Sequence, residues 1–214
     1  NMFLRRIFQL GGAMVILAIT AIPVSAQVTL VRDGAAQAII VTADTPTATT
    51  TYAAEELVAH VARATGVALE IVRESEASEA PHTRVYVGDT EAAQRNGVHT
   101  DRLPRETYTM RSVGNDLFIA GPDGGSDPLS FRTPDGGTLF GVYEFIERYL
   151  GVRWLWPGDL GTYVPSTDTV SFWSVNETHS PALAFRGMYL SRINSVIHGQ
   201  PIDAENSRLG FSPE

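Results

Sequence analysis

The sequence predicts an α/β sandwich, in which two main helices pack on a mixed β-sheet between about Val28 and Trp173. Three observations predict this class. Short runs of alternating apolar and polar residues recur along the chain, as expected of half-buried strands. Two longer segments repeat apolar residues at helical spacing. These helical segments lie between the strands, and strands that alternate with helices build a layered α/β domain.

Four strands are predicted in the first half of this region. Val28–Val31 and Ala38–Val41 are apolar runs separated by a turn at Asp33-Gly34. Two more strands lie in the stretches ALEIVR and RVYVGDT, which a polar loop from Glu74 to Thr83 separates. A short helix is expected from Glu91 towards Gly97.

The first main helix is predicted between a threonine-rich connector and Gly66. Thr50 or Thr51 is the expected N-cap, because a threonine hydroxyl accepts a hydrogen bond from the first turn. Gly66 is expected to end the helix. Its packed face is defined by apolar residues at helical spacing, namely Ala54, Leu57, Val58 and Val61. The opposite face carries Glu56, His60 and Arg63, which we expect to be solvated.

A β-hairpin and a loop come next. YTMRSV and LFIAG are alternating runs on either side of Gly114-Asn115-Asp116, which is typical of a hairpin. The Gly/Pro/Asp-rich stretch from Gly121 to Gly137 is interpreted as a surface loop. It is not interpreted as a phosphate cradle, because it contains neither a G-x-G-x-x-G motif after a strand nor a lysine.

The second main helix is predicted from Thr138 to Leu150, with Gly151 as its stop. Glu144 and Arg148 are spaced to form an ion pair on its solvent side. Its apolar face is Leu139, Val142, Tyr143, Ile146, Tyr149 and Leu150. Two strands are expected after it, at Val152–Trp156 and Thr169–Phe172.

The first 26 residues are typical of an export signal. Arg5 and Arg6 precede an apolar run from Leu10 to Ile22, which is shorter than the roughly 20 residues that a spanning helix needs. Val24-Ser25-Ala26 is a small-residue cleavage signal, so we expect cleavage before Gln27. The mature protein is therefore expected to be secreted or periplasmic in a bacterium, with no membrane contact beyond this signal.

Composition excludes several classes of function. The formal net charge is -8, and because nucleic-acid binding needs clustered cations, nucleic acid is not an expected partner. The chain has no cysteine, which excludes disulfides and thiolate chemistry. All 16 basic residues are arginine, so neither a Schiff-base lysine nor a P-loop lysine is available.

No catalytic residue, metal site or cofactor site is predicted in the chain. The motifs HExxH and GxSxG are absent, which excludes the common helical zinc site and the serine-hydrolase elbow. The histidines are scattered, at His60, His82, His99, His179 and His198. Glycoside hydrolysis needs two carboxylates about 5 to 10 Å apart. No such buried pair is marked among the acids on the helices or in the loop, which are Glu55, Glu56, Glu144, Glu147, Asp123, Asp127 and Asp135.

The stretch GTLFGVYEFIERYLGVRWLWPGDLGTYVP resembles the closing helix-strand segment of the N-terminal domain of α-glucuronidase-like proteins. YAAEELVAHVARATG and RVYVGDT are similar to the same domain in order and spacing, so the resemblance covers about Val28 to Trp173. It implies an accessory domain that precedes a (β/α)8 barrel in large secreted glycoside hydrolases.

The stretch PALAFRGMYLSR is similar to the first barrel strand of β-hexosaminidase-type glycosidases, whose pattern is W-R-G-x-x-L-D-x-x-R. Arg186, Gly187 and Leu190 match this pattern, whereas Phe185 and Ser191 replace its tryptophan and aspartate. The resemblance implies that Arg186 holds sugar hydroxyls and that the catalytic carboxylates lie on later strands. The resulting domain division is a signal peptide at 1–26, an accessory domain at 27–173, a linker at 174–181 and the truncated start of a barrel at 182–214.

Two interpretations of the tryptophans in RWLW remain open. Trp154 and Trp156 share one side of the predicted strand and Arg153 lies on the other. Both rings can pack on the preceding helix or on a neighbouring domain. Alternatively one ring, more readily Trp156, contacts a sugar, and Arg153 pairs with a uronate carboxylate.

The leading functional hypothesis is a non-catalytic accessory domain of an exported carbohydrate-active enzyme. Its partner is an oligosaccharide or polysaccharide handled by the barrel, and the domain buttresses that barrel. The alternative is a stand-alone carbohydrate-binding or structural module of the cell envelope. A third possibility is a stand-alone hydrolase.

Overall fold

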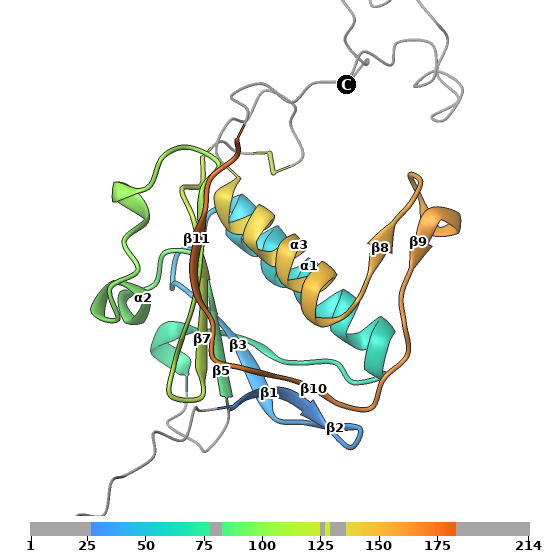
Figure 1. The fold of residues 1–214 in the computed structure, drawn as a ribbon. Coiled ribbons are helices and arrows are strands. Elements are labelled where there is room, and N and C mark those ends of the chain that lie inside the picture. Colours follow the sequence, from blue (N-terminus) through green and yellow to red (C-terminus); the bar gives the residue numbers. More distant parts are fainter. Residues whose placement is uncertain (1–26, 78–82, 125–126, 129–135, 183–214) are drawn as a thin grey trace, which may run out of the picture.

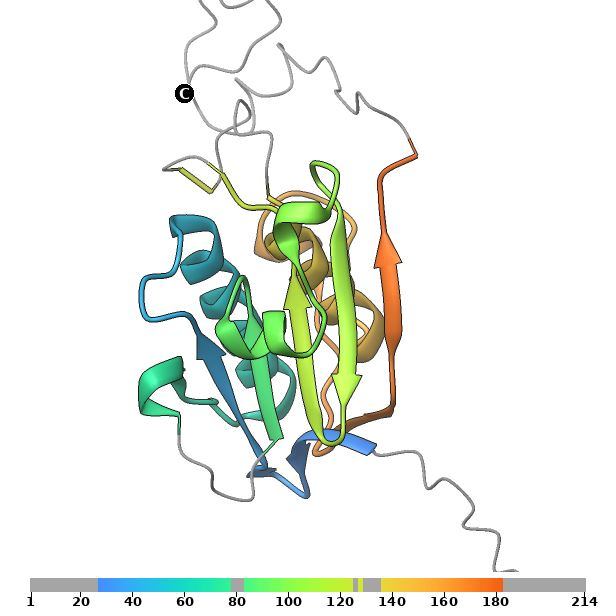
Figure 2. The ribbon, with the colours of Figure 1, turned by 90° about the vertical axis from the view of Figure 1, so that its left-hand side faces the viewer.

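The computed structural model describes residues 27–77, 83–124, 127–128 and 136–182. Its centre is a six-stranded mixed sheet (Figures 1 and 2). In chain order these strands are Ala38–Thr42 (β3), Ile71–Arg73 (β4), Thr83–Val87 (β5), Tyr108–Val113 (β6), Asp116–Ala120 (β7) and Asn176–His179 (β11). Their order across the sheet is β11-β6-β7-β5-β3-β4, with β4, β3, β5 and β7 parallel and with β6 and β11 joined by antiparallel pairing.

The two main helices are Ala48–Thr65 (α1) and Gly137–Tyr149 (α3), and they lie side by side on one face of this sheet (Figure 1). The short helix Glu91–Arg95 (α2) covers part of the other face. Alternation along β5 shows how the sheet divides two cores, because Val85 and Val87 join the core under the main helices whereas Tyr86 joins the core under α2. The α/β sandwich with two main helices is confirmed.

Three strands form a separate small sheet at one end of the main core. They are Gln27–Arg32 (β1), Ala35–Ala36 (β2) and Val170–Trp173 (β10), in the order β10-β1-β2. Val28, Leu30 and Phe172 are buried in the core beneath the main helices. The first and last predicted strands of the sandwich are therefore confirmed as strands, but they pair with each other rather than with the mixed sheet.

Helix α1 begins earlier than the sequence predicted. Its N-cap is Thr47, whose hydroxyl accepts from the backbone N–H of Thr50 at 3.0 Å. The expected cap at Thr50 or Thr51 is wrong, because Thr50 already lies inside the helix, where its own hydroxyl serves another partner described below. Gly66 ends the helix as expected, in the left-handed conformation with φ 76°.

The segment 174–181, expected to be a linker, contains a strand of the main sheet. β11 pairs with β6, with Asn176 opposite Arg111 and His179 opposite Tyr108. The linker prediction is wrong for these four residues. Because β11 is an edge strand whose side chains are largely exposed, its sequence is as polar as that of a linker. Glu177 also pairs with Arg148 of α3, which ties the strand to the helix layer.

The remaining short elements are three 3-10 helices, at Glu74–Glu76, Thr100–Arg102 and Asp159–Gly161, and the strand pair Arg153–Trp154 (β8) and Thr162–Tyr163 (β9). None of the helices in the described ranges combines the length and the apolar character needed to cross a membrane. The expected export signal and the expected barrel strand with Arg186 lie outside the described residues.

Candidate functional site

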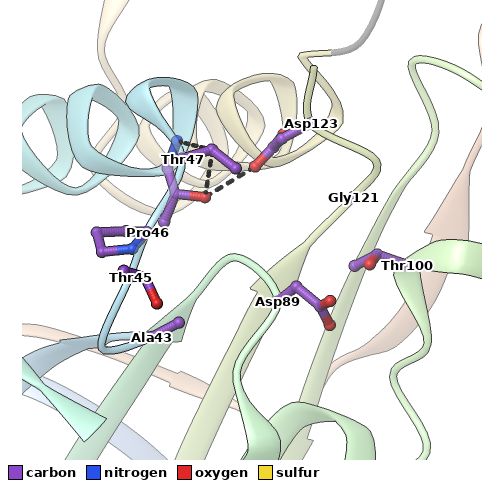
Figure 3. Close-up of a pocket in the computed structure, with 9 residues that line it drawn as sticks. Ala43, Thr45, Pro46, Thr47, Asp89, Thr100, Gly121 and Asp123 are labelled. Atoms are coloured by element: carbon purple, nitrogen blue, oxygen red, sulfur yellow. Dashed lines mark hydrogen bonds between the residues drawn. The ribbon is translucent and has the colours of Figure 1, made fainter. Parts of the chain in front are cut away.

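A pocket of about 230 Å³ opens where the parallel strands β3, β5 and β7 end. Ala43 follows β3, Asp89 lies two residues beyond β5, and Gly121 follows β7. The start of α1 forms another wall (Figure 3). The described lining residues are Ala43, Thr45, Pro46, Thr47, Thr50, Asp89, Thr100, Gly121 and Asp123. The carboxyl edge of the parallel strands is the usual ligand-binding position of α/β sheets.

Asp123 joins both main helices at this edge. Its carboxylate accepts a hydrogen bond from the Thr50 hydroxyl of α1 at 2.9 Å and another from the Thr138 backbone N–H of α3 at 3.0 Å. α3 has no side-chain cap of its own, since Gly136 occupies the N-cap position. Asp123 therefore caps α3 from another part of the chain, and a carboxylate is favoured at that end by the helix dipole.

Asp123 is predicted in a surface loop, and no pair of acids is predicted to be buried. In the structure Asp123 lies in the connection between β7 and α3 and is half-buried, with hydrogen bonds to both main helices that the sequence prediction did not include. One signal in the sequence points to it: the second main helix opens with Gly136-Gly137, so its first N–H groups need an acceptor from elsewhere. The sequence does not say which of the nearby acids supplies it.

Two glycines allow Asp123 to reach α3. A Cβ atom on Gly121 would lie 2.3 Å from the Thr107 carbonyl oxygen and 2.7 Å from the Gly137 Cα. A Cβ atom on Gly137 would meet the same Thr107 oxygen at 2.3 Å. The end of β7 and the start of α3 therefore touch backbone to backbone, and only glycine fits on either side.

The pocket is acidic. Burial is the largest influence on Asp123 and raises the pKa of its carboxyl group above 3.8. Hydrogen bonds from Thr138 and Thr50 lower this pKa, and the nearby Asp89 carboxylate raises it. No basic side chain is among the described lining residues. The pocket therefore offers acceptors to hydroxyl groups and repels anions.

The second feature is the hairpin formed by β8, β9 and the loop between them. The sequence predicted one strand from Val152 to Trp156, but pairing stops after Trp154, because Pro157-Gly158 turns the chain. The loop is closed by hydrogen bonds from the Leu155 N–H to the Gly161 carbonyl at 2.8 Å and from the Thr162 hydroxyl to the Gly158 carbonyl at 3.0 Å. It is a fixed loop rather than the continuation of a strand.

Trp154 packs against both main helices. Its indole ring meets Tyr143 of α3 edge-on at a centroid distance of 5.4 Å and His60 of α1 at 5.5 Å. Burial is the largest influence on the Tyr143 hydroxyl and raises its pKa, and the neighbouring Glu56 and Tyr52 of α1 raise it further. The hairpin is therefore anchored on a polar aromatic cluster that spans α1 and α3.

His60 is buried in this cluster, with 6% of its surface exposed. Its Nδ1 lies 2.8 Å from the Glu56 carbonyl oxygen in the preceding turn. The expectation of a solvated Glu56, His60 and Arg63 face is wrong for His60, because the hairpin folds back over that face. Helical spacing identifies the residues that share a face but not a segment that later covers it.

The other predicted site residues are separated. Arg153 donates from Nη1 to the carbonyl oxygens of Glu147 and Val152, both at 2.8 Å, so its guanidinium closes the end of α3. Trp156 lies in the hairpin loop with 61% of its surface exposed. The structure thus brings Trp154 to the helices, holds Arg153 at a helix end and leaves Trp156 open. Arg186 lies outside the described residues.

Within the described ranges, no group of three or more histidine, aspartate or glutamate side chains is arranged to hold a metal ion. No family model and no curated protein matches the chain. Its fold is found within a large carbohydrate-active enzyme.

That enzyme is BtGH115A, a family GH115 4-O-methyl-α-glucuronidase with specificity for decorated arabinogalactans. The TM-score is 0.51 at 15% identity, over 74% of this chain and 19% of that one. CpGH84D aligns with a TM-score of 0.35 at 10% identity, over 70% of this chain and 21% of its own. A GH138 enzyme targeting pectin rhamnogalacturonan II aligns with a TM-score of 0.31 at 15% identity, over 52% of this chain and 10% of its own. This chain therefore spans about a fifth or less of each of them.

Proposed function

We propose that this chain is the N-terminal accessory domain of an exported carbohydrate-active enzyme, and that it supports a catalytic barrel and lines part of its sugar site. The observation that carries this proposal is the fold likeness to the α-glucuronidase, which extends over 74% of this chain but only 19% of the enzyme. A fold that makes up a minor part of such an enzyme suits a supporting role. The sequence resemblance to the accessory domain of α-glucuronidase-like proteins supports the same role independently.

The hairpin loop is the part of the domain suited to line a sugar site. Trp156 offers an exposed indole ring, and the apolar C–H face of a sugar stacks on such a ring. The hydrogen bonds that close the loop hold the backbone that carries this ring, so the loop loses little freedom when a sugar binds. Because Arg153 is engaged at the end of α3, we assign the sugar contact in this domain to Trp156.

Bond cleavage in this proposal belongs to the barrel that follows. Arg186 holds sugar hydroxyls at the first barrel strand, and the two catalytic carboxylates lie on later strands. The export signal directs the whole enzyme out of the cytoplasm to a secreted or periplasmic location. The substrate class is an oligosaccharide or polysaccharide, and the likeness to a glucuronidase favours one that carries uronate groups.

The reading frame beyond the codon for Glu214 tests this proposal. We expect it to encode alternating strands and helices of a barrel, with a pair of acidic residues at strand ends. A stop codon at that point, with no barrel encoded in a neighbouring frame, would contradict the accessory role. So would turnover of aryl glycosides by the 214-residue chain, since that would make it a hydrolase by itself.

A second candidate is a stand-alone carbohydrate-binding module of the cell envelope, which the exposed rings of Trp156, Tyr163 and Trp173 favour. It predicts that the 214-residue chain binds oligosaccharides without cleaving them. Tryptophan fluorescence titration measures this binding. Trp156→Ala should abolish it, whereas Trp173→Ala, which removes a similarly exposed ring on β10, is the matched control.

A further inference from the structure

The loop of the β8–β9 hairpin carries an apolar surface that the described body does not cover. Leu155 is 77% exposed, Trp156 is 61% exposed and Leu160 is 105% exposed, which means that its side chain touches almost nothing. We call these three residues the hairpin tip. Exposed apolar side chains grouped in this way on a folded domain mark an interaction site.

The hairpin tip is held rigidly. Trp154 anchors its base on α1 and α3, and Arg153 binds the end of α3. Within the loop, a Cβ atom on Gly161 would lie only 2.0 Å from the Trp156 carbonyl oxygen, so the two chain segments are in direct contact. A fixed apolar surface loses little entropy when it docks, as expected of a preformed interface rather than a loose loop.

The chain leaves the described body at the end toward which the tip extends. The Ser180 hydroxyl lies 2.8 Å from that of Thr107, and the Thr107 carbonyl contacts Gly137 at the start of α3. In Figure 1 the hairpin rises from the far end of α3 and runs back beside the helices toward this end. α3 is about 20 Å long, a length that six or seven extended residues cover at about 3.3 Å each. The chain after Ala182 can therefore reach the tip from about Tyr189 onward.

The composition of those residues complements the tip. Residues 183–190, with the sequence LAFRGMYL, are apolar apart from Arg186. Next to Leu160 on the tip stands Asp159, whose side chain is 98% exposed. Its nearest basic group is Arg63 at 3.9 Å, which is a loose surface contact. The apolar side chains of this segment complement the apolar side chains of the tip.

Two other occupants fit less well. A second copy of this chain, docked tip to tip about a twofold axis, would bring the two Asp159 carboxylates near each other. A sugar chain would stack on Trp156 but would gain no hydrogen bond from Leu155 or Leu160. The leucines, which are the most exposed members of the tip, call for an apolar partner.

We propose that the hairpin tip is the docking surface for the part of this same chain that follows Ala182, in which Tyr189 and Leu190 are the first apolar side chains that can reach it. The proposal deepens the accessory role and rests on it in one respect, that a further unit follows the described body. Docking at the tip fixes the angle between this domain and that unit. It also brings Trp156 to the junction between them.

Photo-crosslinking in the 214-residue chain tests the docking. Leu160→p-benzoylphenylalanine places a crosslinker in the tip without disturbing the core, because Leu160 is fully exposed. We expect intramolecular crosslinks to peptides from residues 183–214, found by mass spectrometry in the monomer fraction. Val113→p-benzoylphenylalanine is the control, since Val113 is exposed at the β6–β7 turn at the other end of the sheet and should give no such crosslink.

Adding Leu155→Asp to the tip crosslinker should lower the crosslink yield about tenfold, as expected when one apolar anchor becomes charged. Crosslinked dimers would assign the tip to a second copy and overturn the proposal. An absence of protein crosslinks, or an equal yield from the Val113 position, would also overturn it. Failure of the accessory role would appear in the reading frame or in glycoside turnover, not in these crosslinks, so the two proposals fail separately.

Discussion

The two ends of α3 contrast sharply. At its start, the half-buried carboxylate of Asp123 accepts hydrogen bonds from Thr50 and Thr138, so these two buried residues have a partner for their polar groups. Past its end, the hairpin carries Leu155 and Leu160 into solvent, so apolar groups that would gain from burial have none in the described body. We call the Asp123 hydrogen bonds at the start of α3 the Asp123 joint, because they connect α1 and α3 within the fold. The hairpin past the end of α3 presents apolar side chains that suit a partner.

This difference separates two roles that one helix can have. Buried polar groups must be satisfied within the fold, because an unpaired one is costly, and the Asp123 joint meets that demand. Exposed apolar groups cost the fold little, so they persist where binding needs them. Changes at the start of α3 should therefore affect stability, and changes at the hairpin tip should affect association.

The largest effect is expected at Asp123. Asp123→Ala should lower the free energy of unfolding by about 3 kcal/mol, because the Thr138 N–H and the Thr50 hydroxyl lose their acceptor in a buried setting. Asp123→Asn keeps one acceptor oxygen and should lose clearly less. Urea unfolding measures both. If the alanine variant were as stable as the parent, the Asp123 hydrogen bonds would not stabilise the fold. The two ends of α3 would then not differ in role.

The base of the hairpin should rank next. Trp154→Ala should cost about 2 kcal/mol, because the ring, although 40% of the residue is exposed, packs edge-on against His60 and Tyr143. Trp156→Ala, which removes the same side chain two positions along, should change stability by less than about 0.5 kcal/mol. Thermal unfolding of the pair measures the difference. Equal losses would show that Trp156 is also packed.

A smaller effect is expected from pH. Burial raises the pKa of Asp123 above 3.8, so this group contributes most to stability below that pH and less as pH rises through its folded-state value. The stability of the parent relative to Asp123→Asn should therefore increase as pH falls from neutrality toward 3.8. Urea midpoints of both proteins across this range measure it. A relative loss on acidification would mean that hydrogen bonding outweighs burial at Asp123.

The smallest effect on stability is expected at the tip. Leu160→Ser should leave the free energy of unfolding unchanged to within about 0.5 kcal/mol, because the side chain touches almost nothing. Chemical denaturation checks this. A loss of more than about 1 kcal/mol would place Leu160 in a stabilising contact and remove the contrast on which the docking proposal depends.

Local signals were sufficient for several elements. The β6–β7 hairpin forms around Gly114, which has φ 60°, a conformation that glycine adopts without strain. The Glu144 and Arg148 pair forms as its spacing predicted, with Nη2 2.5 Å from Oε1. Gly151, with φ 72°, follows the last residues of α3 as expected. In each case the cause lies within a few residues of the effect.

The predictions that were wrong involve contacts between segments that are distant in the sequence. Thr47 rather than Thr50 caps α1, since the Thr50 hydroxyl turns to Asp123, which is 73 residues away. His60 is buried by a hairpin that begins at Arg153. β11 was expected to be a linker, because an edge strand with exposed side chains lacks the apolar alternation that identifies a strand.

The sequence by itself determined the alternation of strands and helices, the ends of the helices that glycine sets, and the gathering of apolar residues in RWLWPGDL. These follow from backbone conformation and from the solubility of side chains, both of which are local properties. Only the tertiary structure decided that Asp123 bonds to both main helices, that Arg153 closes a helix, and that the Trp154 ring packs on the helices while Trp156 is open. Burial and hydrogen-bond pairing depend on segments that are distant in the chain, and the local sequence pattern does not show which of these segments will come into contact.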